Sequence, residues 1–124
     1  LQRFEGPAKP REIAASARRR GVGIMGIRAV QAGALTSEFD RQLSGGHPDM
    51  ADYRPAEPFR ELCNELGESP AAVAHRYALS MDEIATIVLG VKNRAELLEC
   101  VEAESKGRLA PEVMARIDGT VARG

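Results

Sequence analysis

The segment that decides the fold spans residues 86–99 and reads TIVLGVKNRAELLE. Its first four residues, Thr86 to Leu89, are uncharged and rich in β-branched side chains, a composition typical of a buried strand. Gly90 breaks this run. Asn93, with Glu96 three residues later, has the spacing of a capping box, which predicts that a helix begins here. The segment therefore predicts a strand that turns directly into a helix, as in parallel α/β folds.

The junction between this strand and this helix is a candidate anion site. The first N–H groups of a helix have no partner within the helix, and the helix dipole is positive at that end. Lys92 and Arg94 add two cations at the same place. Phosphate is the natural ligand of such a junction, and parallel α/β barrels commonly bind phosphate after their last two strands. The alternative is a plain capped helix with Lys92 and Arg94 solvated.

Another strand is predicted within residues 22–30, which read VGIMGIRAV. A continuous apolar run of this length is typical of a strand that is buried on both faces. Arg28 lies at the carboxyl end of this strand, where parallel sheets usually bind their ligands. An ordinary surface arginine is the alternative for Arg28.

The rest of the chain predicts helices and one long loop. Helices are expected over residues 10–20, over residues 59–66, from Pro70, after Asn93 and from Pro111. Leu97, Leu98 and Val101 form the predicted apolar face of the helix after Asn93. Residues 31–58, which are rich in glycine and proline, form the expected long irregular loop.

Strands separated by helices indicate parallel pairing within an α/β fold. Two parallel strands alone leave unpaired, apolar edges. We therefore expect residues 1–124 to form one segment, with two parallel strands and a mostly helical remainder. Further strands, from a missing segment or another chain, would complete its sheet.

Composition narrows the function classes. The chain has 124 residues, of which 44% are hydrophobic and 28% charged, and its formal net charge is −1. This charge favours neither nucleic acid nor an anionic membrane. No apolar run approaches the roughly 20 residues that span a bilayer. Cys63 and Cys100 lie far apart and are expected to be free thiols, as in a cytoplasmic protein.

Two further patterns are weaker. Residues 62–79, with a turn at Gly67, match a helix-turn-helix of DNA-binding proteins, but the second helix offers only His75 and Arg76 as readers of bases. His47 and His75 form no metal-binding motif. We therefore expect neither a nucleic-acid site nor a metal site.

Taken in order, several segments resemble the aldo-keto reductase family. Residues 21–36 (GVGIMGIRAVQAGALT) resemble the family's seventh barrel strand and the loop after it, and residues 69–80 (SPAAVAHRYALS) resemble its seventh helix. Residues 86–93 resemble its eighth strand and nucleotide loop. Residues 109–112 and 117–118 resemble its terminal helix. The resemblance covers nearly the whole chain and implies the C-terminal part of a (β/α)8 TIM barrel.

The resemblance also implies a cofactor and a reaction. Members of this family bind NADP(H) and transfer hydride between it and small carbonyl or alcohol substrates. The residues implied to bind the cofactor are Ile27 at the nicotinamide, Arg28, Ala29 and Val30 along the pyrophosphate with Gly33 in the same loop, Gly90, Val91 and Lys92 around the adenosine phosphate, and Glu96, Glu99 and Cys100 at the adenine. Lys92 is the implied partner of the 2′-phosphate.

Three of these positions depart from the family's pattern. Ile27 replaces an aromatic residue and cannot stack on nicotinamide as a ring can. Ala29 stands in place of the usual proline. Cys100 replaces an asparagine, whose carboxamide both donates and accepts hydrogen bonds. Each departure weakens a cofactor contact.

The family's catalytic Asp, Tyr, Lys and His come from earlier barrel strands, which this chain does not contain. Tyr53 and Tyr77 match neither the position nor the setting of the catalytic tyrosine. We therefore expect the cofactor-binding portion of an NADP(H)-dependent reductase, which is not catalytic alone. The alternative is a non-catalytic binding or structural module that self-associates through exposed strand edges.

Overall fold

The computed structural model describes residues 8–37, 46, 51 and 53–121. Its elements, in chain order, are α1 (Ala8–Arg19), β1 (Met25–Ile27), the 3-10 turns η1 (Gln31–Gly33) and η2 (Arg54–Ala56), α3 (Glu57–Leu66), α4 (Pro70–Leu79), β2 (Thr86–Val88), α5 (Arg94–Ser105) and α6 (Pro111–Val121). The predicted order of helices and strands is confirmed. Of the predicted loop over residues 31–58, η1 and η2 and the start of α3 are described, and residues 38–45, 47–50 and 52 lie outside the described residues.

The sheet of the described residues consists of β1 and β2, which pair in parallel as predicted. Gly26 pairs with Ile87, and Ile27 pairs with Val88. Both strands therefore end at the same edge of the sheet. A Cβ atom on Gly26 would lie 2.7 Å from Cδ1 of Ile87, so the glycine at this position leaves room for the Ile87 side chain.

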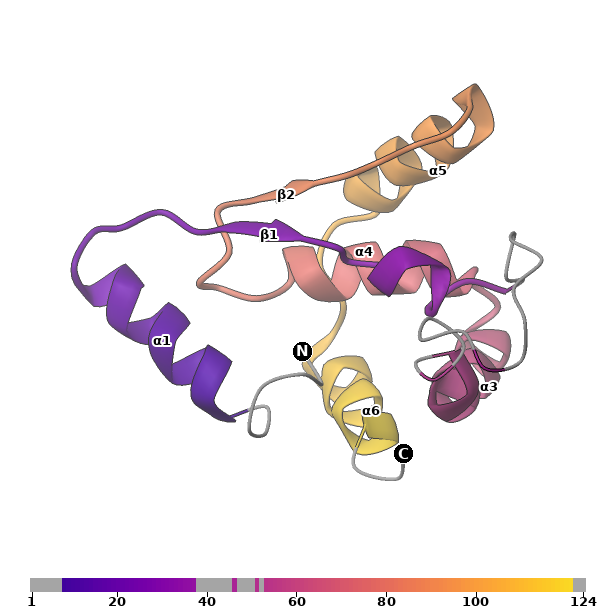
Figure 1. The fold of residues 1–124 in the computed structure, drawn as a ribbon, viewed down its shortest axis with the longest axis horizontal. Helices are drawn as coiled ribbons and strands as arrows, with labels where there is room; N and C mark the ends of the chain where they lie inside the picture. The colour runs from indigo at the N-terminus through magenta and orange to yellow at the C-terminus, as the bar shows by residue number, and fades with distance from the viewer. Residues whose placement is uncertain (1–7, 38–45, 47–50, 52, 122–124) are drawn as a thin grey trace.

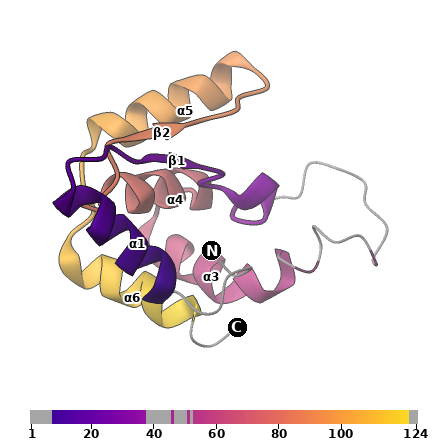
Figure 2. The same ribbon diagram turned by 60° about the vertical axis from the view of Figure 1, so that its left-hand side comes forward.

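Helices pack in layers on one side of this sheet. α4 lies along the sheet and contacts both β2 and α5 (Figure 1). Figure 2 shows α3 and α6 beyond α4, on its side away from the strands. Arg11 of α1 donates hydrogen bonds to Tyr77 of α4 and to Asp118 of α6, each at 2.9 Å. α1 is thereby connected to both inner helices.

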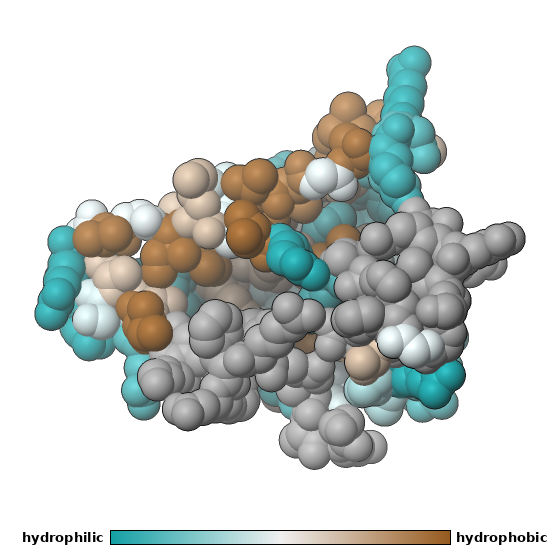
Figure 3. Space-filling model, viewed as in Figure 1, coloured by the Kyte–Doolittle hydropathy of each residue, from teal (hydrophilic) through white to brown (hydrophobic). Residues whose placement is uncertain are grey.

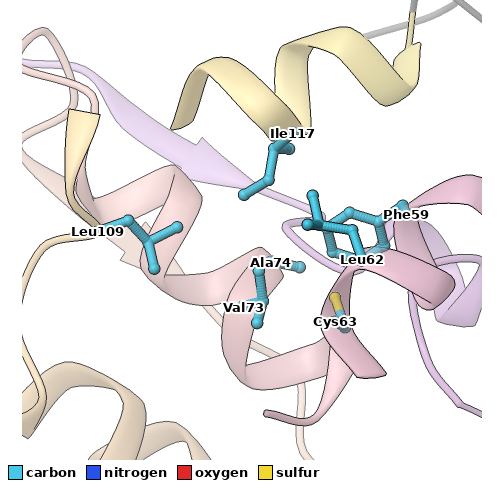
Figure 4. Close-up of a cluster of buried hydrophobic side chains, with 7 residues drawn as sticks. All are labelled: Phe59, Leu62, Cys63, Val73, Ala74, Leu109 and Ile117. Atoms are coloured by element: carbon cyan, nitrogen blue, oxygen red, sulfur yellow. The ribbon is translucent and has the colours of Figure 1, made fainter. Parts of the chain in front are cut away.

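The hydrophobic core lies between α3, α4 and α6 rather than at the sheet. Figure 4 shows its buried side chains converging from these helices and from the turn before α6; they are Phe59, Leu62, Cys63, Val73, Ala74, Leu109 and Ile117. Both α3 and α4 thus turn one side toward this core. Ser69 caps α4, since its hydroxyl accepts a hydrogen bond from the Ala72 N–H at 3.1 Å. Gly67 ends α3 with a φ of 67°.

The predictions of a strand buried on both faces within residues 22–30 and of a buried strand at Thr86–Leu89 are both wrong for this chain. Met25 and Ile27 are each 68% exposed, and Val88 beside Ile27 is half-exposed. The alternating exposure of both strands shows that one face is open, because helices cover only the other. The ladder is also shorter than predicted, since the backbone leaves the extended conformation at Arg28, whose φ is 59°.

The predicted apolar face of α5 is also exposed. Leu97, Leu98 and Val101 are about half-exposed, whereas Cys100 and Ala103 are the buried residues of the helix. α5 packs on α4 through these two smaller side chains. The exposed residues of α5 and of the strands form a broad apolar surface across the strands toward α5 (Figure 3).

Within the described residues, no helix is both long enough and apolar enough to cross a membrane.

Candidate cofactor site

The candidate site is the edge of the sheet where both strands end. Because Ile27 pairs with Val88 in a parallel ladder, the loop that begins at Arg28 and the loop that begins at Leu89 leave the sheet side by side (Figure 1). Ligands of open parallel sheets bind outside these carboxyl ends. The structure therefore brings the two predicted binding segments, residues 27–33 and 90–92, to one edge.

The loop after β1 is held in an unusual backbone conformation. Arg28 and Gln31 both have positive φ angles, 59° and 50°, although neither is a glycine. Gly33 follows with a φ of 97°. A non-glycine residue in this region costs about 1 kcal/mol or more, and such strain is concentrated at functional sites. The loop is closed by internal hydrogen bonds, including Gln31 N–H to the Arg28 carbonyl at 2.8 Å.

The loop after β2 is open and leads into the N-terminus of α5. A Cβ atom on Gly90 would meet nothing within 4 Å, so the backbone there is accessible. Asn93 caps α5, because its side-chain oxygen accepts a hydrogen bond from the Glu96 N–H at 3.0 Å. The predicted capping box is only half confirmed. The Glu96 carboxylate accepts from the N–H of Lys92 at 2.7 Å rather than from that of Asn93.

Lys92 lies at this helix start with its ammonium group largely exposed. Its Nζ lies 3.6 Å from Oε1 of Glu96 on the next turn. An exposed pair of this kind stabilises the fold little, so the lysine can exchange its carboxylate partner for a more highly charged anion. Gly90, Val91, Lys92 and Glu96 thus surround one exposed helix N-terminus.

The remaining two predicted residues, Glu99 and Cys100, lie deeper along α5. Glu99 accepts a short hydrogen bond from the Ser69 hydroxyl and so joins α5 to the start of α4. Cys100 is buried, with its Sγ atom 3.7 Å from Nδ1 of His75. Burial raises the pKa of the Cys100 thiol, and the carboxylates of Glu99 and Glu96 raise it further. The Cys100 side chain is therefore buried against α4.

His75 gives this contact a pH dependence. Burial lowers the pKa of His75 below its usual value of about 6.5, although Glu99 acts in the opposite direction. The imidazole therefore takes up a proton less readily in the folded chain than in the unfolded chain. As pH falls below about 6.5, the unfolded state binds more protons, and the free energy of unfolding decreases.

We therefore expect the free energy of unfolding to be lower at pH 5.5 than at pH 7.5, measured by urea denaturation. His75→Gln should remove this loss. His47→Gln, which changes the other histidine of the sequence, should retain it. An equal pH dependence in His75→Gln and the unsubstituted chain would contradict a lowered pKa for the buried His75.

Both tyrosine hydroxyls are engaged elsewhere in the fold rather than at this edge. Tyr77 lies on α4, where its hydroxyl donates to Asp118 and accepts from Arg11. Burial, followed by the interaction with Asp118, raises the pKa of Tyr77 to about 12. The hydroxyl of Tyr53 donates to the carbonyl of Ser37 at 3.1 Å. Among the described residues, no cluster of three or more histidine, cysteine or acidic side chains could hold a metal ion.

On the helix pair α3 and α4, the two residues that were considered as readers of bases have partners within the fold. His75 is buried, and the guanidinium of Arg76 donates to Glu68 at 2.6 Å and to the carbonyl of Gly107 at 3.0 Å. The two predicted readers of bases are thus engaged within the fold.

One residue near the site was not predicted. Arg60 of α3 is buried, and its guanidinium donates to the carbonyl of Ala34, directly after the loop that follows β1. In the sequence, the only local sign of this role is Glu57, one helical turn earlier, which pairs with Arg60. Of its other partners, Tyr53 lies 7 residues away in the sequence, and Ala34 lies 26 residues away.

Comparison of the sequence with known proteins and protein families shows which family the chain belongs to. Among proteins with curated descriptions, none matches this chain. The sequence profile of the Aldo/keto reductase family matches residues 5–122, nearly the whole chain and both segments that meet at the candidate site. Members of this family have a (β/α)8 barrel fold and are oxidoreductases. They generally use NADP(H) with carbonyl substrates. The chain belongs to the Aldo/keto reductase family.

Proposed function

We propose that this chain is the C-terminal, cofactor-binding portion of an NADP(H)-dependent aldo-keto reductase. The observation that carries the proposal is the meeting of two loops at one sheet edge. The loop that follows β1 is strained, and the loop that follows β2 leads to the N-terminus of α5 beside Lys92. A strained loop, a helix N-terminus and an exposed cation together suit a dinucleotide with several phosphates.

The residues of the edge fit the phosphate end of NADP(H) better than its other parts. The open backbone at Gly90 and the exposed ammonium of Lys92 suit the adenosine phosphates. Exposed Arg28 lies where the pyrophosphate would run, beside Ala29 and Val30. Ile27 offers an apolar surface at the strand end. Cys100 does not fit the adenine role, because its side chain is buried against His75.

In such an enzyme the bound cofactor supplies the hydride, and this chain's part is to hold and orient it. The exposed apolar face of β1 and β2 supports the view that the chain is a portion of a barrel. Met25, Ile27 and Val88 lie on that face. In a (β/α)8 barrel the face away from the helices is packed with side chains from the other strands. We propose that the remaining strands, with the catalytic groups, complete the fold.

We also propose a cytoplasmic location. Cys63 and Cys100 are both free and buried. Burial raises the pKa of the Cys63 thiol to about 12, so this thiol stays protonated and unreactive. Free thiols suit a reducing compartment.

Lys92→Ala is expected to weaken binding of NADPH about 10-fold or more while leaving binding of NADH within about 2-fold. The reason is that only NADPH carries the 2′-phosphate, and a charge-assisted hydrogen bond contributes roughly 1.5–3 kcal/mol. Chemical-shift titration of the chain with each cofactor measures both affinities, including weak ones.

Lys106→Ala is the matched control, because Lys106 lies at the other end of α5 and pairs with Glu68 at 3.3 Å. This variant should bind both cofactors as the unsubstituted chain does. Equal losses for NADPH and NADH in Lys92→Ala would count against a 2′-phosphate role for Lys92.

A second candidate function is a non-catalytic module that self-associates. The open apolar face of the strands favours it, since exposed apolar surface of this extent marks interaction sites. Sedimentation of the chain separates the two functions. A stable dimer that NADPH neither binds nor disrupts would support self-association, whereas a monomer that binds NADPH would support the cofactor-binding role.

A further inference from the structure

Arg60 is the buried charged residue in the middle of α3. Only 6% of its surface is exposed. A buried guanidinium is costly to keep in a fold unless its N–H groups are paired. The partners of the Arg60 guanidinium therefore show which parts of the chain it holds in place.

The guanidinium connects three parts of the chain. One terminal nitrogen donates to the carbonyl of Ala34 at 3.0 Å, and the other donates to the carbonyl of Tyr53 at 2.7 Å. Nε and the second terminal nitrogen both donate to Glu57, at 3.1 and 2.6 Å. The guanidinium also lies over the Tyr53 ring, 3.9 Å from its centre. The planar fork of arginine makes these simultaneous contacts possible.

The contact with Ala34 matters because of what precedes it. Arg28 and Gln31 hold positive φ angles within the loop after β1, and strain of this kind persists only where the surroundings fix it. The start of the loop is fixed by the pairing of Ile27 with Val88. Its end is fixed at Ala34, which is 2% exposed and bonded to Arg60.

We propose that Arg60 is a positioning residue that holds the loop of residues 28–36 in its strained, cofactor-accepting conformation. The effect on NADPH affinity rests on the proposed function, whereas the effect on the loop conformation does not. Arg60 lies beneath the loop and is itself too buried to touch a ligand at the sheet edge. Its effect on affinity passes through Ala34, since displacement of binding groups by about 1 Å can change affinity or rate about 100-fold.

The test uses Arg60→Gln, Arg60→Lys and a matched control, Arg116→Gln. Arg116 of α6 pairs with Glu65 of α3 in a short, exposed contact that does not involve the loop. Two quantities are measured on each 124-residue chain. The first is amide hydrogen exchange at Gly33, Ala34 and Leu35, whose N–H groups donate within the loop. The second is the affinity for NADPH.

Arg60→Gln should speed exchange of these amides at least about 10-fold and weaken NADPH about 10- to 100-fold. Arg60→Lys should give intermediate exchange rates and affinities, because an ammonium group retains the charge but cannot make the several directed hydrogen bonds of the planar guanidinium. Arg116→Gln should change neither quantity. If Arg60→Gln fails to fold, as judged by its circular dichroism, the Arg60→Lys variant carries the same comparison.

Unchanged exchange at Gly33, Ala34 and Leu35 in a folded Arg60 variant would overturn the inference. Faster exchange with unchanged NADPH affinity would also overturn it, because the loop geometry would not matter to the cofactor. If the unsubstituted chain binds no NADPH while the Arg60 variants free the loop, the proposed function fails, and Arg60 remains the residue that fixes the loop.

Discussion

Leu62→Ala is expected to lower the free energy of unfolding by about 2–5 kcal/mol, whereas Leu97→Ala should change it by no more than about 0.5 kcal/mol. Leu62 lies in the core between α3, α4 and α6, and only 5% of it is exposed. Its truncation removes buried apolar surface and leaves a cavity. Leu97 lies on the open face of α5 and has little packing to lose.

The two variants make the same chemical change at sites that differ in burial, so urea denaturation followed by circular dichroism compares them directly. A Leu62→Ala chain too unstable to fold would agree with the expected direction. Similar losses in both variants would show that Leu97 is packed in solution. The apolar surface across β1, β2 and α5 would then be covered, as the self-associating alternative requires.

The chain alone is expected to give no NADPH-dependent reduction of carbonyl compounds above the rate without protein. Reduction needs a proton donor beside the carbonyl, with a pKa near the working pH. Tyr77 has a pKa raised to about 12 and is engaged by Asp118 and Arg11 on α4. Tyr53 donates its hydroxyl proton to the carbonyl of Ser37.

The measurement is the loss of NADPH absorbance with a small aldehyde and a quinone, using protein at high concentration. Enzymes typically accelerate their reactions by a million-fold or more, so an active site would be obvious. Turnover that survives Tyr53→Phe and Tyr77→Phe would show that the chain carries a proton donor of another kind. Turnover of any size would contradict the proposal that catalysis requires the remaining barrel strands.

Local sequence patterns were sufficient to predict the order of elements in this fold. The β-branched run at Thr86–Val88, the helix start at Asn93 and the turn at Gly67 each depend on a few neighbouring residues, and the structure confirms all three. Parallel pairing followed from strands separated by helices. It places the two predicted binding loops at one edge, which is the most useful result of the sequence for the site.

Burial was predicted less well, because it depends on what lies opposite a surface. The spacing of Leu97, Leu98 and Val101 shows that these residues share a face, but it cannot show whether a partner covers that face. The same holds for Met25 and Ile27 on the strands. Both errors have one physical cause: an apolar pattern shows which residues share a face, but not whether another part of the protein covers that face.

The conformation of the loop after β1 could not be predicted from its residues. Positive φ angles are expected at Gly33 but not at Arg28 or Gln31. Their conformation depends on restraints at both ends of the loop, and one of these comes from Arg60, which is 26 residues from Ala34. A contact over this separation leaves no pattern in a single sequence.

Binding of NADPH at the sheet edge can be tested by mapping amide chemical shifts of the isotope-labelled chain. We expect shifts at residues 28–33 and 90–96, with Gly33, Gly90 and Lys92 among the most affected, and a smaller shift of Lys92 with NADH. Shifts confined to the groove between α3 and α6, which Pro58, Leu62, Arg116 and Gly119 line, would contradict binding at this edge. So would the absence of any shift at saturating NADPH.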